Sequence, residues 1–256
     1  MARGPAELAP DRYVELLLAD AERMATLAER DLALDVPPCP GWTVRDALVH
    51  TGHVYLHKVA NIRTQAKAEF PPVPAPDSDE VKWFRAALDE LVGELTSRAP
   101  DSPAYTWHPP DQTVGFWARR MAQETAVHRI DVESAFDQVT PIADDLALDG
   151  VDEFLDLFLG GDWELDADEW GDVSPQAGAG TTTAVSAGSH TWRITLHPER
   201  VDISRDGGPA DARVTAPDAS TLLLWLWGRV DDEPVTASGD EVALSALRDR
   251  LTIAGQ

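Results

Sequence analysis

Residues 114–136 read VGFWARRMAQETAVHRIDVESAF, and this stretch decides the fold of the first half of the chain. Its side chains repeat at helical spacing, and one stripe joins Trp117, Met121, Glu124, His128, Asp131 and Ala135. Such a stripe predicts a helix that faces the core of a helical bundle. The middle of the stripe nevertheless holds two carboxyl groups and one imidazole. Because ionisable groups in a core need a partner or a metal, the stripe also predicts a polar site inside the bundle.

A second cluster of ionisable residues lies upstream. Glu124 and His128 are four residues apart, so both side chains can reach one ion, although a Glu–His pair on a solvated face would have the same spacing. His50, His53 and His57 share one face of an earlier predicted helix, and His50 lies nearest its apolar positions. One His from this helix plus Glu and His from the other would form a three-ligand site with open positions. That arrangement is typical of a catalytic metal centre.

Three more helices complete the predicted bundle. The first has Asp11 as its expected N-cap and carries apolar residues at helical spacing to residue 27. The second follows Thr43, which with Asp46 three residues later forms a capping-box pattern, and it runs to about residue 66. The third covers residues 81–95. Breaker-rich segments separate these elements, so the pattern favours a four-helix bundle over residues 1–160.

The second half of the chain has a different character. A short helix is expected at residues 147–159, and residues 174–183 are expected to be irregular. Strand-like pieces at 191–196, 200–204 and 212–215 alternate with predicted helices at 219–227 and 241–251. We therefore predict an α+β protein of two domains: a bundle at 1–160, an acidic linker at 161–173 and a small α/β domain at 174–256.

The charge balance excludes several partners. The chain has 256 residues with 21 bases and 45 acids, a net charge of −24, and residues 141–173 contribute 12 acids and no base. Such a surface repels nucleic acids and anionic membranes. No apolar run approaches the roughly 18–20 residues of a membrane span, and we see no signal peptide. A single cysteine, Cys39, fits a reducing compartment, so we expect a cytoplasmic protein.

Two segments resemble a known family. The sequences PCPGWTVRDALVH at 38–50 and ETAVHRID at 124–131 resemble the mycothiol-dependent maleylpyruvate isomerase family, part of the DinB-like metal-binding bundle superfamily. Residues 149–155 and 222–229 also resemble that family, and its C-terminal domain is similar to sterol-carrier domains. The resemblance implies a DinB-like bundle followed by a sterol-carrier-like domain.

The resemblance also implies a chemistry. It implies a divalent metal held by His50, Glu124 and His128, usually zinc, with nickel and iron also suited to these ligands. It further implies a low-molecular-weight thiol, mycothiol, as cosubstrate that attacks a small electrophile, in an S-transferase or an isomerase. Two alternatives stay open: a non-catalytic protein that binds a metal or small ligand, and a hydrolase that activates water on the same metal.

Other residues receive roles around this site. Asp131 is expected to orient a ligand, although a bundle salt bridge would explain it equally. Arg229, from the second domain, is expected to bind a substrate carboxylate, and a cation at a helix end is the alternative. We assign Trp42 and Arg129 to cofactor binding; Trp42 would otherwise close its loop onto the core. Cys39 is expected to be structural, and Arg119 and Arg120 to point away from the metal. The protein is expected to be a monomer or homodimer.

Overall fold

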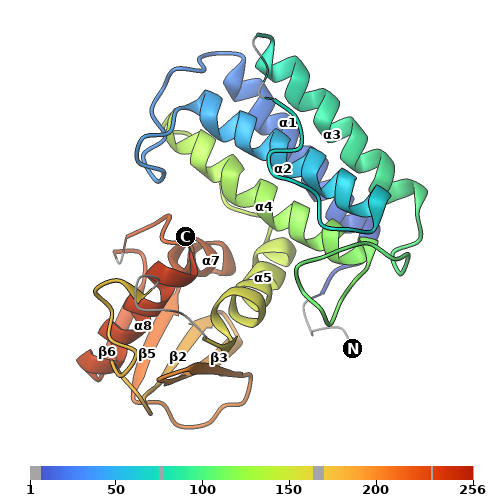
Figure 1. The fold of residues 1–256 in the computed structure, drawn as a ribbon. Helices are drawn as coiled ribbons and strands as arrows, with labels where there is room; N and C mark the ends of the chain where they lie inside the picture. Colours follow the sequence, from blue (N-terminus) through green and yellow to red (C-terminus); the bar gives the residue numbers. More distant parts are fainter. Residues whose placement is uncertain (1–6, 75, 77, 164–169, 232, 256) are drawn as a thin grey trace. The chain divides into compact units, whose positions relative to one another are not determined.

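The first unit of the structure is a bundle of four helices. The structure, a computed structural model, describes residues 7–74, 76, 78–163, 170–231 and 233–255. It divides them into two units that meet between Thr140 and Pro141. The bundle contains α1 (Pro10–Ala28), α2 (Val44–Thr64), α3 (Glu80–Ser97) and α4 (Val114–Ser134) (Figure 1). Helix α1 packs against α4 and α3, and α2 packs against α3 and α4. The predicted four-helix bundle is therefore confirmed.

Local signals fix where these helices begin. Thr43 caps α2 in a capping box, with the Thr43 amide donating to Asp46 Oδ2 at 2.8 Å, as the sequence predicts. Thr113 caps α4 by accepting from the Phe116 amide at 3.2 Å. The prediction of Asp11 as the cap of α1 is wrong. Helix α1 begins at Pro10, with Ala9 at the cap position and Asp11 in the first turn, where a proline and an acid are both favourable.

Helix α4 lies at the centre of the bundle and is buried on nearly every side. Trp117 and Met121 from the predicted stripe are at most 1% exposed. They join the large apolar side chains of the core, which include Leu17, Met24, Leu48, Phe84 and Leu91. The Tyr55 hydroxyl lies 2.6 Å from Thr125 Oγ1, so this buried polar pair is satisfied between α2 and α4. This packing holds α2 and α4 in a fixed relation, which the site below requires.

The second unit is a mixed sheet with helices on it. It contains α5 (Asp144–Glu153), the π-helical turn η1 (Phe154–Leu159), β1 (Gly161–Asp162), β2 (Thr182–Ala187), β3 (His190–His197), β4 (Arg200–Ser204), β5 (Ala212–Ala216), α7 (Ala219–Leu226), β6 (Thr236–Gly239) and α8 (Glu241–Ala254). The strand order is β1-β4-β3-β2-β5-β6, and the β2–β5 pair is parallel while the others are antiparallel. Burial alternates along β3 and β5, and α7 and α8 contact β2 and β5, so helices cover one face of the sheet.

The boundary between the units differs from the sequence-based one. Residues 141–160, assigned to the bundle by sequence, belong to the sheet unit. Helix α5 packs against α7, and the Ile142 amide donates to Ser220 Oγ at 2.9 Å. In the predicted acidic linker, Gly161 and Asp162 form β1, and Trp163 and Trp170 are buried. Residues 164–169 of that linker lie outside the described residues.

Strands β2 and β6 were not predicted, and β2 begins inside the segment expected to be irregular. Both strands owe their conformation to pairing with distant segments: β2 lies between β3 and β5, and β6 pairs with β5.

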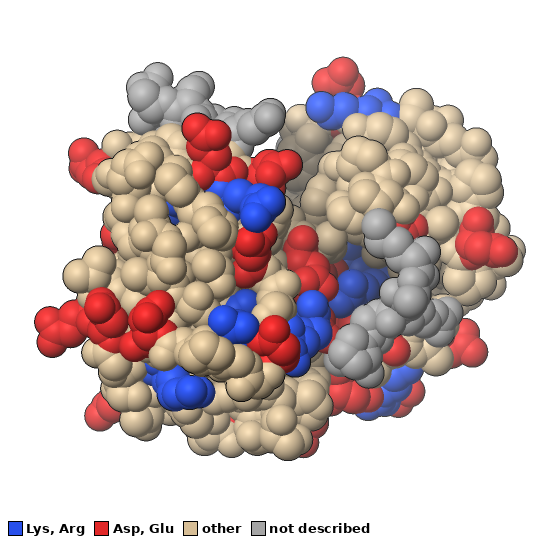
Figure 2. Space-filling model, turned by 90° about the horizontal axis from the view of Figure 1, so that it is seen from below, with Lys and Arg blue, Asp and Glu red and all other residues tan. Residues whose placement is uncertain are grey.

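Acidic side chains are spread over the surface, and many bases lie among them. On the face drawn in Figure 2, several Lys and Arg side chains lie next to Asp or Glu. Arg85, for example, donates to Glu22 and to Glu29, each at 2.6 Å. Among the described residues, no helix combines the length and the apolar composition that crossing a bilayer requires.

Candidate metal centre

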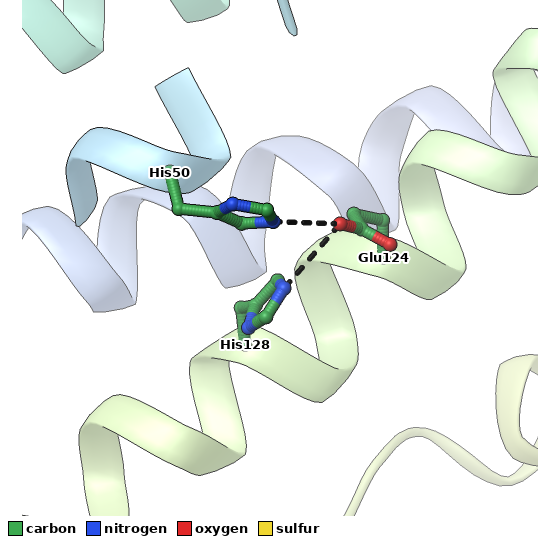
Figure 3. Close-up of side chains that lie close together, drawn as sticks. All are labelled: His50, Glu124 and His128. Carbon is green, nitrogen blue, oxygen red and sulfur yellow. Dashed lines mark ion pairs between the residues drawn. The ribbon is translucent and has the colours of Figure 1, made fainter. Parts of the chain in front are cut away.

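Three side chains from two helices converge inside the bundle (Figure 3). His50 projects from α2, and Glu124 and His128 project from successive turns of α4. Glu124 Oε1 lies 3.7 Å from His50 Nε2 and 3.3 Å from His128 Nε2. One donor atom from each residue lies within 4.8 Å of the other two. The structure thus brings together the three residues that the sequence nominated, with both imidazoles and one carboxylate oxygen facing one another.

A hydrogen bond orients His128. Its Nδ1 lies 2.9 Å from Asp131 Oδ2, and the Asp131 side chain is 0% exposed. A neutral imidazole that donates from Nδ1 to a carboxylate has its lone pair on Nε2, the atom that faces Glu124. The Cys39 thiol donates to the same Asp131 oxygen at 3.5 Å. Asp131 therefore contacts the side of His128 that faces away from Glu124, and Cys39 contacts the same oxygen; the role of Asp131 toward a metal stays a prediction.

Two aromatic rings border the three ligand candidates. The Trp42 ring lies 5.0 Å from the His50 ring and stacks at 6.1 Å over the His128 ring. The Phe70 ring meets His50 edge-on at 6.3 Å, although half of the Phe70 residue is exposed. Because the His50 side chain is 32% exposed, the site opens to solvent beside these rings. The sequence did not single out Phe70, which lies in a breaker-rich loop with no readable motif.

Charges around Glu124 keep its carboxyl group ionised. Burial opposes the charge, but His128, His50 and Arg120 together hold the pKa of Glu124 well below its ordinary value. Burial likewise opposes a charge on His128, but Asp131 and Glu124 raise its pKa to about 9. Burial lowers the pKa of nearby Lys58 to about 8, against the attraction of Glu124. Glu124 is thus ion-paired with His128 and Arg120 and lies close to His50.

The side chain of Arg120 points in a different direction from the predicted one. The sequence stripe placed it away from the metal ligands, but its Nη2 donates to Glu124 Oε2 at 2.9 Å, and the residue is 4% exposed. The signal that would have found it is the four-residue spacing between Arg120 and Glu124, which pairs opposite charges on a helix.

The remaining predicted residues lie elsewhere. Arg129 points toward α1 and donates to Asp20 Oδ1 at 3.2 Å and to Glu133 Oε2 at 2.7 Å, so it belongs to a buried ion-pair network of the bundle. Arg229 follows α7 in the sheet unit, where its Nη1 donates to the Trp227 carbonyl at 2.9 Å. That contact is the one expected of a cation at a helix C-terminus, and its catalytic role stays a prediction.

A comparison with protein-family models finds a match that lies within the helical unit. Residues 19–133 match a family model described as the mycothiol maleylpyruvate isomerase N-terminal domain. No curated protein sequence gives a significant match to this chain.

Two solved structures share the fold. A crystal structure of the mycothiol-dependent maleylpyruvate isomerase aligns with a TM-score of 0.62 and 12% identity, over 91% of this chain and 95% of that one. A histidine-to-alanine variant of the mycothiol-dependent maleylpyruvate isomerase aligns with a TM-score of 0.58 and 13% identity over the same shares. A structure described as the UbiJ-SCP2 ubiquinone synthesis protein covers 43% of this chain and 89% of its own at 18% identity, but its TM-score of 0.30 is too low to support a conclusion.

Proposed function

Since residues 19–133 match the family model of the mycothiol maleylpyruvate isomerase N-terminal domain, we propose that this chain is an enzyme that uses mycothiol as its thiol cosubstrate. The observation that carries the proposal is the convergence of His50, Glu124 and His128. These residues would hold a divalent metal, with zinc as the first candidate. The single cysteine fits a cytoplasmic enzyme.

The geometry of the three residues fits such an ion. Zinc in a tetrahedral site binds nitrogen and oxygen ligands at about 2.0–2.2 Å, which separates neighbouring ligand atoms by roughly 3.4 Å. Glu124 Oε1 lies 3.7 and 3.3 Å from the two imidazole nitrogens, so small movements of the side chains are enough. Three protein ligands leave a fourth position for another molecule, which is the pattern of catalytic rather than structural zinc sites.

The surrounding residues support thiol chemistry at this position. A divalent metal bound there would coordinate the thiol sulfur and favour its deprotonated, nucleophilic form at neutral pH. By accepting a hydrogen bond from Nδ1, Asp131 favours the neutral form of His128 whose Nε2 lone pair is available to a metal. Trp42 and Phe70 border the open side and would shield a bound thiol from water.

The reaction we propose begins when the thiolate sulfur adds to an electrophilic carbon–carbon double bond of a small substrate: the S–C bond forms while the π bond breaks, and its electron pair moves to the conjugated carbonyl oxygen as an enolate. In an isomerase, the adduct rotates about the carbon–carbon bond that is now single, the enolate re-forms the double bond, the S–C bond breaks and the thiolate leaves unchanged. In an S-transferase, the enolate instead takes up a proton, and the S-conjugate is the product. For Arg229 we propose a role in holding a substrate carboxylate, since a guanidinium binds a carboxylate with two parallel hydrogen bonds.

Activity measurements with defined components test the proposal. Protein purified without chelators is offered mycothiol together with maleylpyruvate and a panel of other small electrophiles. We expect turnover that requires both the metal and mycothiol and that is lost in Glu124→Gln. Turnover without any thiol would instead indicate a hydrolase. Tight metal binding without turnover of any electrophile would indicate a binding protein.

A further inference from the structure

We propose that Arg120 is a positioning residue that fixes the Glu124 carboxylate, so that one oxygen is presented to the metal and the other is kept from it. This inference rests on the proposed metal site and adds a residue that the three-ligand arrangement does not contain.

The two oxygens of Glu124 have different partners. Oε2 accepts from Arg120 Nη2 at 2.9 Å, one helical turn away on α4. Oε1 faces both imidazoles, at 3.7 Å from His50 Nε2 and 3.3 Å from His128 Nε2. The Arg120 side chain is 5% exposed, whereas the Glu124 side chain is 21% exposed, so the arginine contacts the carboxylate from the interior of the bundle. The plane of the carboxylate is therefore set by a buried, charged hydrogen bond.

Such a bond is needed because the last torsion of a glutamate is soft. Rotation about the bond to the carboxylate carbon is broad and roughly two-fold, so packing alone does not decide which oxygen faces the imidazoles. A charge-assisted hydrogen bond from a guanidinium is strong and directional. Removing Arg120 leaves the carboxylate free to turn or to place both oxygens on the metal.

Lys58 cannot take over this task. Its Nζ lies 3.0 Å from His57 Nδ1 and sits over the Trp117 ring at 4.9 Å from the centroid. These contacts engage the ammonium group with one residue of α2 and one of α4, whereas Arg120 donates directly to Glu124 from one turn away on the same helix. An ammonium also lacks the planar fork of a guanidinium. Arg120 is thus distinguished from Lys58 by its place on the same helix as Glu124 and by its planar guanidinium group.

The consequence concerns the fourth metal position. If Glu124 binds through Oε1 alone, a coordination position is kept for an incoming ligand. Binding through both oxygens would place the ion on Oε2 beside the guanidinium group that already donates to this oxygen at 2.9 Å, so two cations would compete for it. We infer that Arg120 keeps Glu124 a one-oxygen ligand and so keeps room for the thiol sulfur.

Cobalt(II) is a suitable probe, because its visible absorption reports the number and arrangement of its ligands. Metal-free full-length protein is titrated with Co²⁺ as wild type, Arg120→Gln, Arg120→Lys and Arg98→Gln. Arg98 is a matched control: it pairs with Glu94 at 2.8 Å, also four residues apart, but at the C-terminal end of α3. Circular dichroism and thermal unfolding of the metal-free proteins establish that each variant is folded. His128→Ala shows whether cobalt uses the proposed site.

We expect Arg120→Gln to weaken cobalt binding by about 10–100-fold, the usual effect of losing a partner of a ligand, and to change the absorption bands. The cobalt affinity and the absorption bands of Arg120→Lys should both fall between those of wild type and Arg120→Gln, and those of Arg98→Gln should match wild type. Unchanged affinity and bands in Arg120→Gln, or an equal loss in Arg98→Gln, would overturn the positioning role. If Arg120→Gln does not fold, wild-type affinity and bands in Arg120→Lys would overturn it. Equal cobalt binding by His128→Ala and wild type would show instead that the metal site itself is wrong.

Discussion

Replacing Asp131 by Asn removes one negative charge beside His128 and keeps the size of the side chain. In the native protein, Asp131 Oδ2 accepts from His128 Nδ1 at 2.9 Å and also from the Cys39 thiol at 3.5 Å. An asparagine offers one amide oxygen and one NH₂ group at this position. If the NH₂ group faces Nδ1, the proton of a neutral His128 moves to Nε2, and the nitrogen that faces Glu124 can no longer bind a metal.

The size of the effect follows from the type of bond. A hydrogen bond to a charged group contributes ~1.5–3 kcal/mol, and Asp131 is fully buried, so solvent does not screen it. Each 1.4 kcal/mol is a factor of ten in an equilibrium constant, so Asp131→Asn should weaken metal binding by about 10–140-fold. The range overlaps the effect usually seen for residues that orient a metal-binding histidine.

Competition of the purified protein with a chelator of known affinity measures this constant. Asp202→Asn is the matched control, since Asp202 Oδ2 also lies 3.0 Å from a histidine nitrogen, His197 Nε2, but on the surface of the other unit. Asp202→Asn should bind metal as tightly as wild type. An Asp131→Asn protein that is folded and binds metal within a factor of two of wild type would refute the reasoning.

Three further predictions concern pH, stability and the second unit. Metal affinity should rise with pH up to about 9, because the carboxylates raise the pKa of His128 to about 9 and its proton must leave before a metal binds. The same raised pKa of His128 stabilises the metal-free protein fully below pH ~6.5, and this stabilisation is lost as the pH rises through about 9. Titration calorimetry from pH 6 to 9 checks the metal affinity, and unfolding of the metal-free protein over the same range checks the stability. Arg129→Met should cost about 3 kcal/mol in urea unfolding at pH 7, the lower end of the range for breaking a buried ion pair, because buried Glu133 loses Arg129 but keeps Arg23 at 2.8 Å. The loss should shrink in acid as the lowered pKa of Glu133 is passed, and an equal loss at pH 7 and in acid would contradict the prediction. The Arg229→Ala protein should retain its metal and its fold, yet its kcat/KM should be lower by about 10–140-fold, which is the kinetic equivalent of one charged hydrogen bond. An unchanged kcat/KM would show that Arg229 is only a cation at a helix end.

Local patterns account for what the sequence predicted well. The stripe on α4 follows from helical spacing alone, and the capping box at Thr43 follows from two residues three positions apart. His50 could be singled out because it lies among apolar positions of the same helix. The convergence of these residues then required only that the two helices pack face to face.

Features that depend on distant partners could not be predicted in the same way. Strand β2 has no clear alternation of polar and apolar residues, and its pairing with β3 and β5 joins segments far apart in sequence. The direction of Arg120 depends on the rotation of α4 within the bundle, which a stripe defines only approximately. Phe70 reaches His50 through the path of a loop, and no local rule sets that path.

X-ray absorption spectroscopy at the edge of the bound metal tests the central claim most directly, because it reports the atoms bound to the ion. The protein is loaded with one equivalent of zinc and measured with and without mycothiol, alongside His50→Ala. We predict a shell of nitrogen and oxygen ligands at about 2.0–2.1 Å that gains one sulfur at about 2.3 Å when mycothiol is added, and a smaller nitrogen contribution in His50→Ala. A zinc shell without sulfur in the presence of saturating mycothiol, or an identical shell in His50→Ala, would contradict the account.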